Sequence, residues 1–545
     1  MKKKLGLLAG MAVLAAVIAA VVAYASPYAP VVQPVRDIEE IWAIEDTRQE
    51  SEEPLISAME NHGAALGYDW FENTFYCTLG MENGDTWPDI HLTVPGAKDI
   101  EVCFVDDYTY DWCADAIREG YPYQIIAYND EFFSYAQIIF TGLPVVRMTT
   151  QEEIPAHVDV AGGLTMSFGG GRELESYMRA HKRGATTLRD KEKNGYKVEL
   201  TRGADGSRKT KMQVDGIGYT DEFVMLSCVA DYEMMRDRLS WDLYNMMEDR
   251  SATMGARNLY YCELFVNNRY QGVYLVFEPF DYEAELQKTS AAAAETDSIY
   301  RLVRLAPGEV SERPMHTDEI SGYTYELYHT RKAQNVFAQL EKYLNVFNAK
   351  KNADFSDGIM NVMDYENVLR YYLLVQAGGM TDSIRNNLYI WGHETKDGTI
   401  IRLAPWDLDV SWGRDDDYND QVWWPIDFFD RMLEIDCGGV MRRELLRVWR
   451  ELRETVLNEE TIGQLIDRYT FELGDSGAFY RDAVRWGKPN SYADGYNIYA
   501  YAKARFEMMD RRIEEIAGEA LADRLLRIEG YTTFDEGDLA EAMKR

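Results

Sequence analysis

Two acidic stretches decide how this chain is interpreted: DSIRNN at 382–387 and PWDLDVSWG at 405–413. Between them lie an apolar segment at 388–391, a polar turn at 394–398 and a second apolar segment at 399–403. This order predicts a strand, a turn and a strand. We therefore expect the two acidic stretches to lie at the ends of one β-hairpin.

The chemistry of the two stretches is that of phosphoryl transfer. Asp382 and Asn387 have the Asp-x-x-x-x-Asn spacing of a kinase catalytic loop, where the Asp meets the substrate hydroxyl and the Asn holds a metal ion. Asp407 or Asp409 would then hold the other side of Mg²⁺. The spacing alone is frequent by chance in long chains, and an Asp in a turn often only caps it. The hairpin between the two stretches favours a functional site.

The composition of the whole chain limits its class. Its 545 residues suit two or three domains, and 46% hydrophobic with 13% aromatic residues excludes a disordered chain. A formal charge of −35 repels nucleic acid, so we expect no nucleic-acid partner. The same charge attracts divalent cations and basic proteins, although solubility alone would also explain it.

The N-terminus is typical of a targeting segment. Three lysines at 2–4 precede an apolar stretch at 5–22, and Ala-Tyr-Ala at 23–25 fits a cleavage site. The apolar stretch is also just long enough to cross a bilayer. A cleaved signal peptide and an uncleaved anchor at 1–25 are both open, and the cleavage site favours the first. Both predict a secreted or membrane-anchored protein outside the cytoplasm, with membrane contact only through this anchor.

The cysteines do not indicate a metal site. There are six, and none forms a Cys-x-x-Cys pair, which argues against zinc. An exported protein permits disulfides, and Cys77, Cys103 and Cys113 are the candidates for one bridge. Buried free thiols are an equally good expectation.

The residue pattern predicts an α+β protein with a two-lobed, kinase-like domain behind a small β-sandwich. Residues 26–55 are rich in Pro and acidic side chains and suggest a linker. Short alternating segments in 56–150 favour a sandwich of immunoglobulin-like type. Strand and helix patterns mix from 151 to about 336 and helical periodicity dominates beyond, which predicts one domain over 151–525. Residues 526–545 form an acidic tail.

A nucleotide site needs a cation for the phosphates. The segment at 183–196 offers Arg183, a glycine turn, Lys191 and Lys193 next to a strand pattern. A lysine there could reach the phosphates as a point charge, although a basic surface loop explains it equally well. The predicted hairpin at 263–278 ends at Glu278, where backbone amides could contact adenine.

Taken together, these motifs resemble the CotH kinase family, named for spore coat protein H. The resemblance covers about 150–520 and is strongest in the two acidic stretches. It is also carried by RGATT at 183–187, MRDRL at 235–239 and VNNRYQGVY at 266–274, and the late Arg485-Trp486 supports it. Members of the family are atypical protein kinases that use ATP and a divalent cation to phosphorylate Ser or Thr of proteins.

The resemblance implies roles for residues of this chain. Asp382 would be the catalytic residue. The ligands of Mg²⁺ or Mn²⁺ would be Asn387 together with Asp407 or Asp409. The contacts of ATP would be Lys193 or Lys191 with Arg183 at the phosphates, and Glu278 near adenine. The family usually has a Pro-Lys-Lys run before Tyr196, whereas DKEKNG stands here at 190–195, so which lysine serves is open.

Two other functions fit the same residues. One is a cell-surface or spore-coat-like binding protein that keeps the fold without catalysis, because ATP is scarce outside a cell. The other is a carbohydrate-associated protein whose acidic turn at 414–420 binds Ca²⁺, although no Gly-then-Glu completes an EF-hand there. For a kinase, the acidic charge favours basic Ser/Thr-rich substrates.

Overall fold

The computed structural model forms two compact units, each described here by itself. It describes residues 30–82, 84–184, 188–189, 192–247, 258–278, 293–303, 313–384, 386–414, 419–488 and 493–528. The first unit contains Met1–Val229, Asn258–Glu278 and Tyr469–Ala493. The second contains Ala230–Arg257, Pro279–Arg468 and Asp494–Arg545. The predicted targeting segment at 1–25 and all but the first residues of the predicted acidic tail lie outside the described residues.

The front of the first unit is a six-stranded sheet in the order β4-β5-β9-β8-β7, with β1 paired to β9. Its strands are β1 (Gln49–Glu50), β4 (Gly67–Asp69), β5 (Thr74–Thr78), β7 (Glu101–Phe104), β8 (Tyr123–Tyr128) and β9 (Phe132–Thr141). A smaller sheet contains β2 (Glu60–Asn61), β3 (Ala64–Ala65) and β6 (Leu92–Thr93). Helices α2 (Ile38–Thr47) and α3 (Cys113–Glu119) belong to the same segment.

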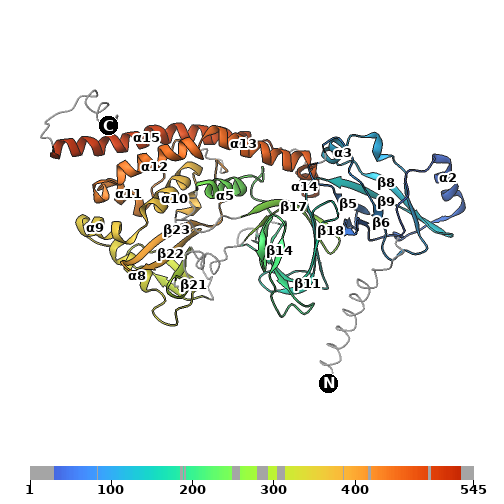
Figure 1. Cartoon of the computed structure of the whole chain (residues 1–545), viewed down its shortest axis with the longest axis horizontal. Helices are drawn as coiled ribbons and strands as arrows, with labels where there is room; N and C mark the ends of the chain where they lie inside the picture. Colours follow the sequence, from blue (N-terminus) through green and yellow to red (C-terminus); the bar gives the residue numbers. More distant parts are fainter. Residues whose placement is uncertain are drawn as a thin grey trace, which may run out of the picture. The chain divides into compact units, whose positions relative to one another are not determined.

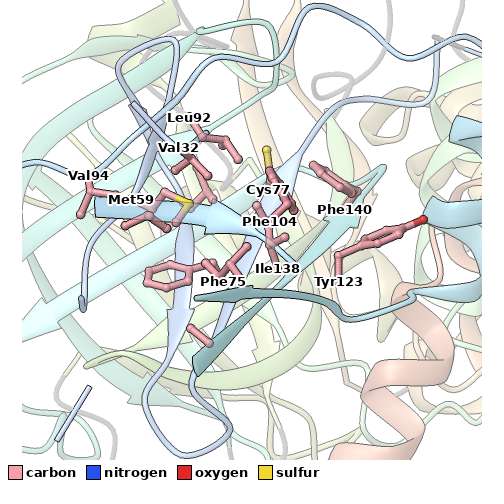
Figure 2. Close-up of a cluster of buried hydrophobic side chains, with 14 of the residues drawn as sticks. Val32, Met59, Phe75, Cys77, Leu92, Val94, Phe104, Tyr123, Ile138 and Phe140 are labelled. Atoms are coloured by element: carbon pink, nitrogen blue, oxygen red, sulfur yellow. The ribbon is translucent and has the colours of Figure 1, made fainter. Parts of the chain in front are cut away.

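The core of this segment is apolar and aromatic (Figure 2). Phe75, Ile138 and Phe140 are fully buried in it, and the same cluster contains Leu92 of β6 and Val32, whose N–H donates to the Leu92 carbonyl oxygen at 2.9 Å. The segment is β-rich, as predicted, but it departs from an immunoglobulin-like sandwich. The pairings β1–β9 and β5–β9 are parallel, whereas that sandwich is built from antiparallel sheets. A parallel pair needs a long crossover, and the chain from β5 to β9 supplies one that includes α3.

The three candidate disulfide cysteines are free thiols. Cys77 and Cys113 lie in the core of the front segment, and Cys103 lies in a smaller cluster with Ile126. Burial raises the pKa of the Cys103 and Cys113 thiols to about 11, so both are protonated at neutral pH. The expectation of buried free thiols therefore describes these residues better than the disulfide does.

A closed barrel follows in the order β10-β11-β12-β13-β16-β18-β17. Its strands are β10 (Val145–Thr150), β11 (Val160–Ser167), β12 (Glu173–Arg183), β13 (Gly195–Thr201), β16 (Glu222–Leu226), β17 (Leu259–Val266) and β18 (Arg269–Phe277). A separate two-stranded ribbon, β14 (Met212–Val214) with β15 (Gly218–Thr220), stands between β13 and β16 in the chain. Met178, Val198 and Leu264 are fully buried in its interior. The parallel pairing of β10 with β17 closes the barrel, which leaves these strands without a free edge.

The front segment and the barrel that follows residue 144 belong to the same compact unit and contact each other. Tyr76 of the front sheet stacks on Tyr270 of β18 at 5.1 Å between ring centroids, and it meets the edge of Phe265 at 5.0 Å. These rings form one small buried cluster with Ile139 and Val145, so the front sheet and the barrel, each with its own core, pack against each other there. Contacts of this kind are decided by packing and leave no composition signal at the boundary.

The second unit places helices around a five-stranded sheet in the order β20-β21-β19-β22-β23 (Figure 1). Its strands are β19 (Ser298–Val303), β20 (Met315–Thr317), β21 (Thr324–Thr330), β22 (Leu388–Thr395) and β23 (Gly398–Pro405). Its helices include α5 (Arg236–Met247), α7 (Ala293–Thr296), α8 (Ala338–Phe347), α9 (Asn352–Val362), α10 (Tyr365–Gly378), α11 (Asp427–Glu434), α12 (Met441–Thr455), α13 (Glu459–Thr470) and α15 (Tyr496–Ile528). Among the described helices, none has both the length and the apolar content to cross a membrane.

Candidate functional site

The predicted hairpin is present and brings the two acidic stretches together. Strand β22 pairs with β23 from Leu388↔Pro405 to the turn at Thr395↔Gly398. The ladder continues one step further, where the Trp406 N–H donates to the Asn387 carbonyl oxygen at 3.0 Å. The carboxylates that follow β23 therefore lie beside the residues that precede β22.

Asn387 connects the two stretches through its side chain. Its Nδ2 donates to Asp382 Oδ2 at 2.9 Å and to the Asp407 carbonyl oxygen at 3.4 Å. Asn387 is buried, whereas Asp382 and Asp407 are exposed. The backbone is left-handed at Asn387 and Asp407, with φ of 50° and 54°. Non-glycine residues seldom adopt this conformation, although Asn and Asp do so more readily than others, and their surroundings must hold it.

Asp409 lies in a more enclosed and more negative environment. Burial raises its pKa from 3.8 to about 7, and the neighbouring Asp407 carboxylate adds to this, while Arg414 opposes it. Arg414 Nη1 contacts Asp409 Oδ2 at 2.6 Å. A divalent cation placed here would relieve the repulsion between the carboxylates of Asp407 and Asp409.

Asp237 is a further carboxylate that interacts with Asp407 and Asp409. The sequence alone did not identify it as a site residue. It lies in the first turn of α5, and its Oδ1 accepts the Leu408 N–H at 3.2 Å. Burial raises its pKa well above the ordinary value, and Asp407 and Asp409 raise it further. The only signal in the sequence was the Asp inside MRDRL at 235–239, at the start of a helix.

The donor chemistry of these residues fits Mg²⁺ or Mn²⁺. Carboxylate and amide oxygens are the ligands that hard divalent cations prefer, and the Nδ2 bonds of Asn387 leave its Oδ1 as the ligand atom. Within the described ranges, no three His, Cys, Asp or Glu side chains are grouped so as to hold a metal. The proposed set has two carboxylates, Asp407 and Asp409, and in kinases phosphate oxygens and water complete the shell.

The raised pKa of Asp409 predicts a pH dependence of stability. The folded protein binds the Asp409 proton up to about pH 7, whereas the unfolded chain releases it near pH 4. Folding is therefore favoured by this group below about pH 4, and that contribution is lost as the pH rises to about 7. In Asp409→Asn the side chain does not titrate. We expect the melting temperature of the variant, relative to the wild type, to rise between pH 5 and pH 8 without metal.

Differential scanning calorimetry of both proteins across this range measures the difference directly. A difference that stays constant with pH would show that Asp409 titrates at its ordinary value.

In the first unit, Lys193 forms a buried ion pair. Its Nζ contacts Asp482 Oδ1 at 2.5 Å and donates to the Val273 carbonyl oxygen at 2.7 Å. The ammonium also lies 5.0 Å from the ring centroid of Tyr274. The Lys193 and Asp482 side chains are only 1% and 5% exposed. The lysine is thus held in place by β18 and by an acidic partner, and these bonds engage two of its three N–H groups.

Asp482 is the partner that sequence reasoning missed. It lies on α14 (Ala478–Arg485), which docks on β18 through Arg485 Nε to the Tyr270 carbonyl oxygen and Trp486 Nε1 to the Gln271 carbonyl oxygen. Asp482 Oδ1 also accepts the Val273 N–H at 2.8 Å. The sequence signal was the Arg485-Trp486 pair, which marked this helix but not its acid.

Gly272 makes the close approach of Asp482 possible. Its φ is +91°, and a Cβ at this position would overlap Asp482 Oδ1. We expect Gly272→Ala to lower the free energy of unfolding by about 2–4 kcal/mol, from backbone strain plus overpacking. Urea denaturation measures this. Gly218→Ala is the matched control, because φ there is +118° but nothing lies within 4 Å of its Cβ. An equal loss in both variants would exclude the overlap with Asp482.

The other predicted nucleotide contacts are less defined. Arg183 is the last residue of β12 and pairs with Gly195, the first residue of β13. Lys193 precedes Gly195 by two residues in the chain. Glu278 follows β18, and its carboxylate accepts Asn258 Nδ2 at 3.2 Å. Lys191 lies outside the described residues, as does most of the acidic turn considered for Ca²⁺. The nucleotide roles of Arg183, Lys193 and Glu278 stay predictions.

Comparison with known proteins gives one family. The model of the family described as CotH kinase protein matches residues 180–515, which is more than half of the chain. The match begins in β12 and includes Lys193, the hairpin with its acidic ends, and Asp482. No curated protein matches the chain.

Proposed function

The chain belongs to the CotH kinase protein family, and we propose that it is an exported protein kinase that transfers phosphate from ATP to Ser or Thr with the help of Mg²⁺ or Mn²⁺. The observation that carries this proposal is the arrangement around Asn387. One buried amide holds the exposed Asp382 and the backbone of Asp407 together. The proposal is supported by this closeness, because a kinase needs its catalytic carboxylate near its metal ligands.

Asp382 would act on the protein substrate. Its carboxylate is exposed, and Asn387 Nδ2 holds one oxygen, Oδ2. The second oxygen can then accept the proton of a Ser or Thr hydroxyl and orient that hydroxyl toward the phosphate. The carboxylate would thus contribute both a proton acceptor and the orientation of the hydroxyl.

Asn387, Asp407 and Asp409 would hold the metal ion. When bound, the ion neutralises the charge that develops on the phosphate oxygens. The protein supplies oxygen ligands on a backbone held by β22 and β23, and Arg414 fixes the Asp409 carboxylate on one side. Asn387 directly precedes β22, and Asp407 and Asp409 follow β23 by two and four residues, so the paired strands hold the chain on which the ligands lie.

Lys193 would provide positive charge for the ATP phosphates. Its pairing with Asp482 supports this role, because kinases hold their phosphate-binding lysine through an ion pair with a carboxylate on a helix. Lys191 is the alternative for this role, and it lies outside the described residues. Arg183 and Glu278 would complete the nucleotide contacts at the phosphates and near adenine.

The substrate and the compartment are further parts of the proposal. The N-terminal segment at 1–25 supports export, either as a cleaved signal or as an anchor. The charge of −35 supports a substrate with basic Ser/Thr-rich segments, because opposite charge accelerates association. A peptide screen that shows preference for acidic acceptors would exclude basic Ser/Thr-rich segments as the preferred substrate.

The experiment that tests the function is phosphorylation with γ-labelled ATP. The protein without its first 25 residues is incubated with Mg²⁺ or Mn²⁺, alone and with a basic Ser-rich peptide, beside an Asp382→Asn variant. Label in the wild type and none in the variant supports a kinase with Asp382 as its catalytic residue. Absence of label in both, together with no ATP binding by calorimetry, would instead favour a surface-binding protein with a kinase-like fold.

A further inference from the structure

The loop at 405–413 holds an unfavourable backbone conformation. Asp407 and Trp412 both have left-handed dihedral angles, with φ of 54° and 50°. Each costs an L-residue on the order of 1 kcal/mol, and such residues persist only where their surroundings hold them. The contacts that hold this loop therefore also fix the directions of the two carboxylates that it carries.

Helix α5 provides those contacts from one face. Asp237 Oδ1 accepts the Leu408 N–H at 3.2 Å. Ser240 Oγ accepts Trp412 Nε1–H at 2.9 Å and lies 3.2 Å from Ser411 Oγ. Asp237 and Ser240 are three residues apart and so lie on the same side of the helix. Asp237 thus binds the loop at Leu408, between Asp407 and Asp409, and Ser240 binds it near its end, at Trp412.

Leu408 is the residue through which Asp237 acts. Its side chain is fully buried, its N–H is bound by Asp237, and its carbonyl oxygen accepts the Ser411 hydroxyl at 2.7 Å. Leu408 stands between the two proposed metal ligands in the chain. Because Leu408 is the residue between them, a rotation of its peptide groups would change the directions in which the Asp407 and Asp409 side chains leave the backbone.

The start of α5 is itself fixed. Asp231 Oδ2 accepts the Arg236 N–H at 2.8 Å, and the Arg236 guanidinium pairs with Asp231 and with Glu233. All three side chains are buried. The first turn of the helix, which carries Asp237, therefore cannot shift without breaking buried ion pairs.

We propose that Asp237 is a positioning residue for the metal-binding loop: its carboxylate accepts the Leu408 N–H, and in this way it aligns Asp407 and Asp409 without binding the metal itself. The inference rests on the proposed function for the metal, but the hydrogen bond can be tested without one. An acceptor oxygen is required at 237, whereas a negative charge is not.

The experiment compares Asp237→Asn, which keeps an acceptor oxygen, with Asp237→Ala, which removes it. The first readout is amide hydrogen exchange of the segment at 405–413 in metal-free protein. We expect the Leu408 amide to exchange at least about tenfold faster in Asp237→Ala and near the wild-type rate in Asp237→Asn. Asp242→Asn is the control, because Asp242 lies on the same helix and pairs with Arg468.

The second readout is Mn²⁺ affinity, measured by electron paramagnetic resonance with ATP present. We expect Asp237→Ala to weaken binding about 10–100-fold and Asp237→Asn to stay within about threefold of the wild type, as for other residues that orient ligands. Circular dichroism spectra establish that both variants fold.

Two results would overturn the proposal. Unchanged exchange at Leu408 in Asp237→Ala would remove the positioning role. Equal loss of Mn²⁺ affinity in both variants would make the Asp237 carboxylate a ligand or an essential charge. A wild-type protein that binds no Mn²⁺ would instead contradict the proposed function, while the exchange data still decide the role of Asp237.

Discussion

Replacing Asp382 with Asn should lower the rate of phosphoryl transfer by about 10²–10⁴-fold while the protein stays folded. The amide has the shape of the carboxylate but cannot accept the hydroxyl proton. Its oxygen can still receive the Asn387 Nδ2–H that now reaches Asp382 Oδ2, so the contact between the two stretches survives. Because Asp382 is exposed, the substitution leaves no buried group unpaired.

Steady-state kinetics with γ-labelled ATP, together with a thermal melt, measure both halves of this expectation. The loss should appear in kcat with little change in ATP affinity, because Asp382 acts on the hydroxyl rather than on the nucleotide. Asp397→Asn is the matched control, since Asp397 is exposed at the opposite end of the same hairpin and should leave kcat unchanged. A wild-type rate in Asp382→Asn would exclude Asp382 as the catalytic residue.

Replacing Lys193 with Met should lower both stability and activity. The substitution leaves the buried Asp482 carboxylate without its cation, which costs about 3–5 kcal/mol in buried ion pairs. Removing the charge proposed for the phosphates should also slow transfer by roughly 10²–10³-fold. Urea denaturation and the kinase assay measure the two effects.

A double variant separates the two effects. In Lys193→Met with Asp482→Asn, no buried charge is left, and the amide oxygen can still accept the Val273 N–H. We expect stability to return to within about 1–2 kcal/mol of the wild type, while activity stays low. Lys182→Met is the control, because Lys182 pairs with a Glu153 side chain that is 86% exposed, and its loss should cost about 1 kcal/mol or less. Recovery of activity in the double variant would remove Lys193 from the mechanism.

The sequence was most informative where the interacting residues are near one another in the chain. The alternation of apolar residues and the turn at 394–398 were enough to predict β22 and β23, and so the meeting of Asp382, Asn387 and Asp407. The helical periodicity noted beyond about residue 336 agrees with helices such as α10 and α12 of the second unit. The front segment was predicted as β-rich, but its parallel pairs were not, because strand order depends on a crossover that local patterns do not encode.

What the sequence determined by itself is the family and the local hairpin that carries the acidic residues. Only the tertiary structure decided which acid pairs with Lys193, because Asp482 follows it by 289 residues in the chain. It likewise decided which helix binds the Leu408 N–H, because Asp237 precedes Leu408 by 171 residues. It also decided that the front sheet packs against the barrel through a small aromatic cluster. A short hairpin closes at little entropic cost and is specified by its own turn, whereas contacts between distant segments form only when packing across the whole unit offsets the entropy of closing a long loop.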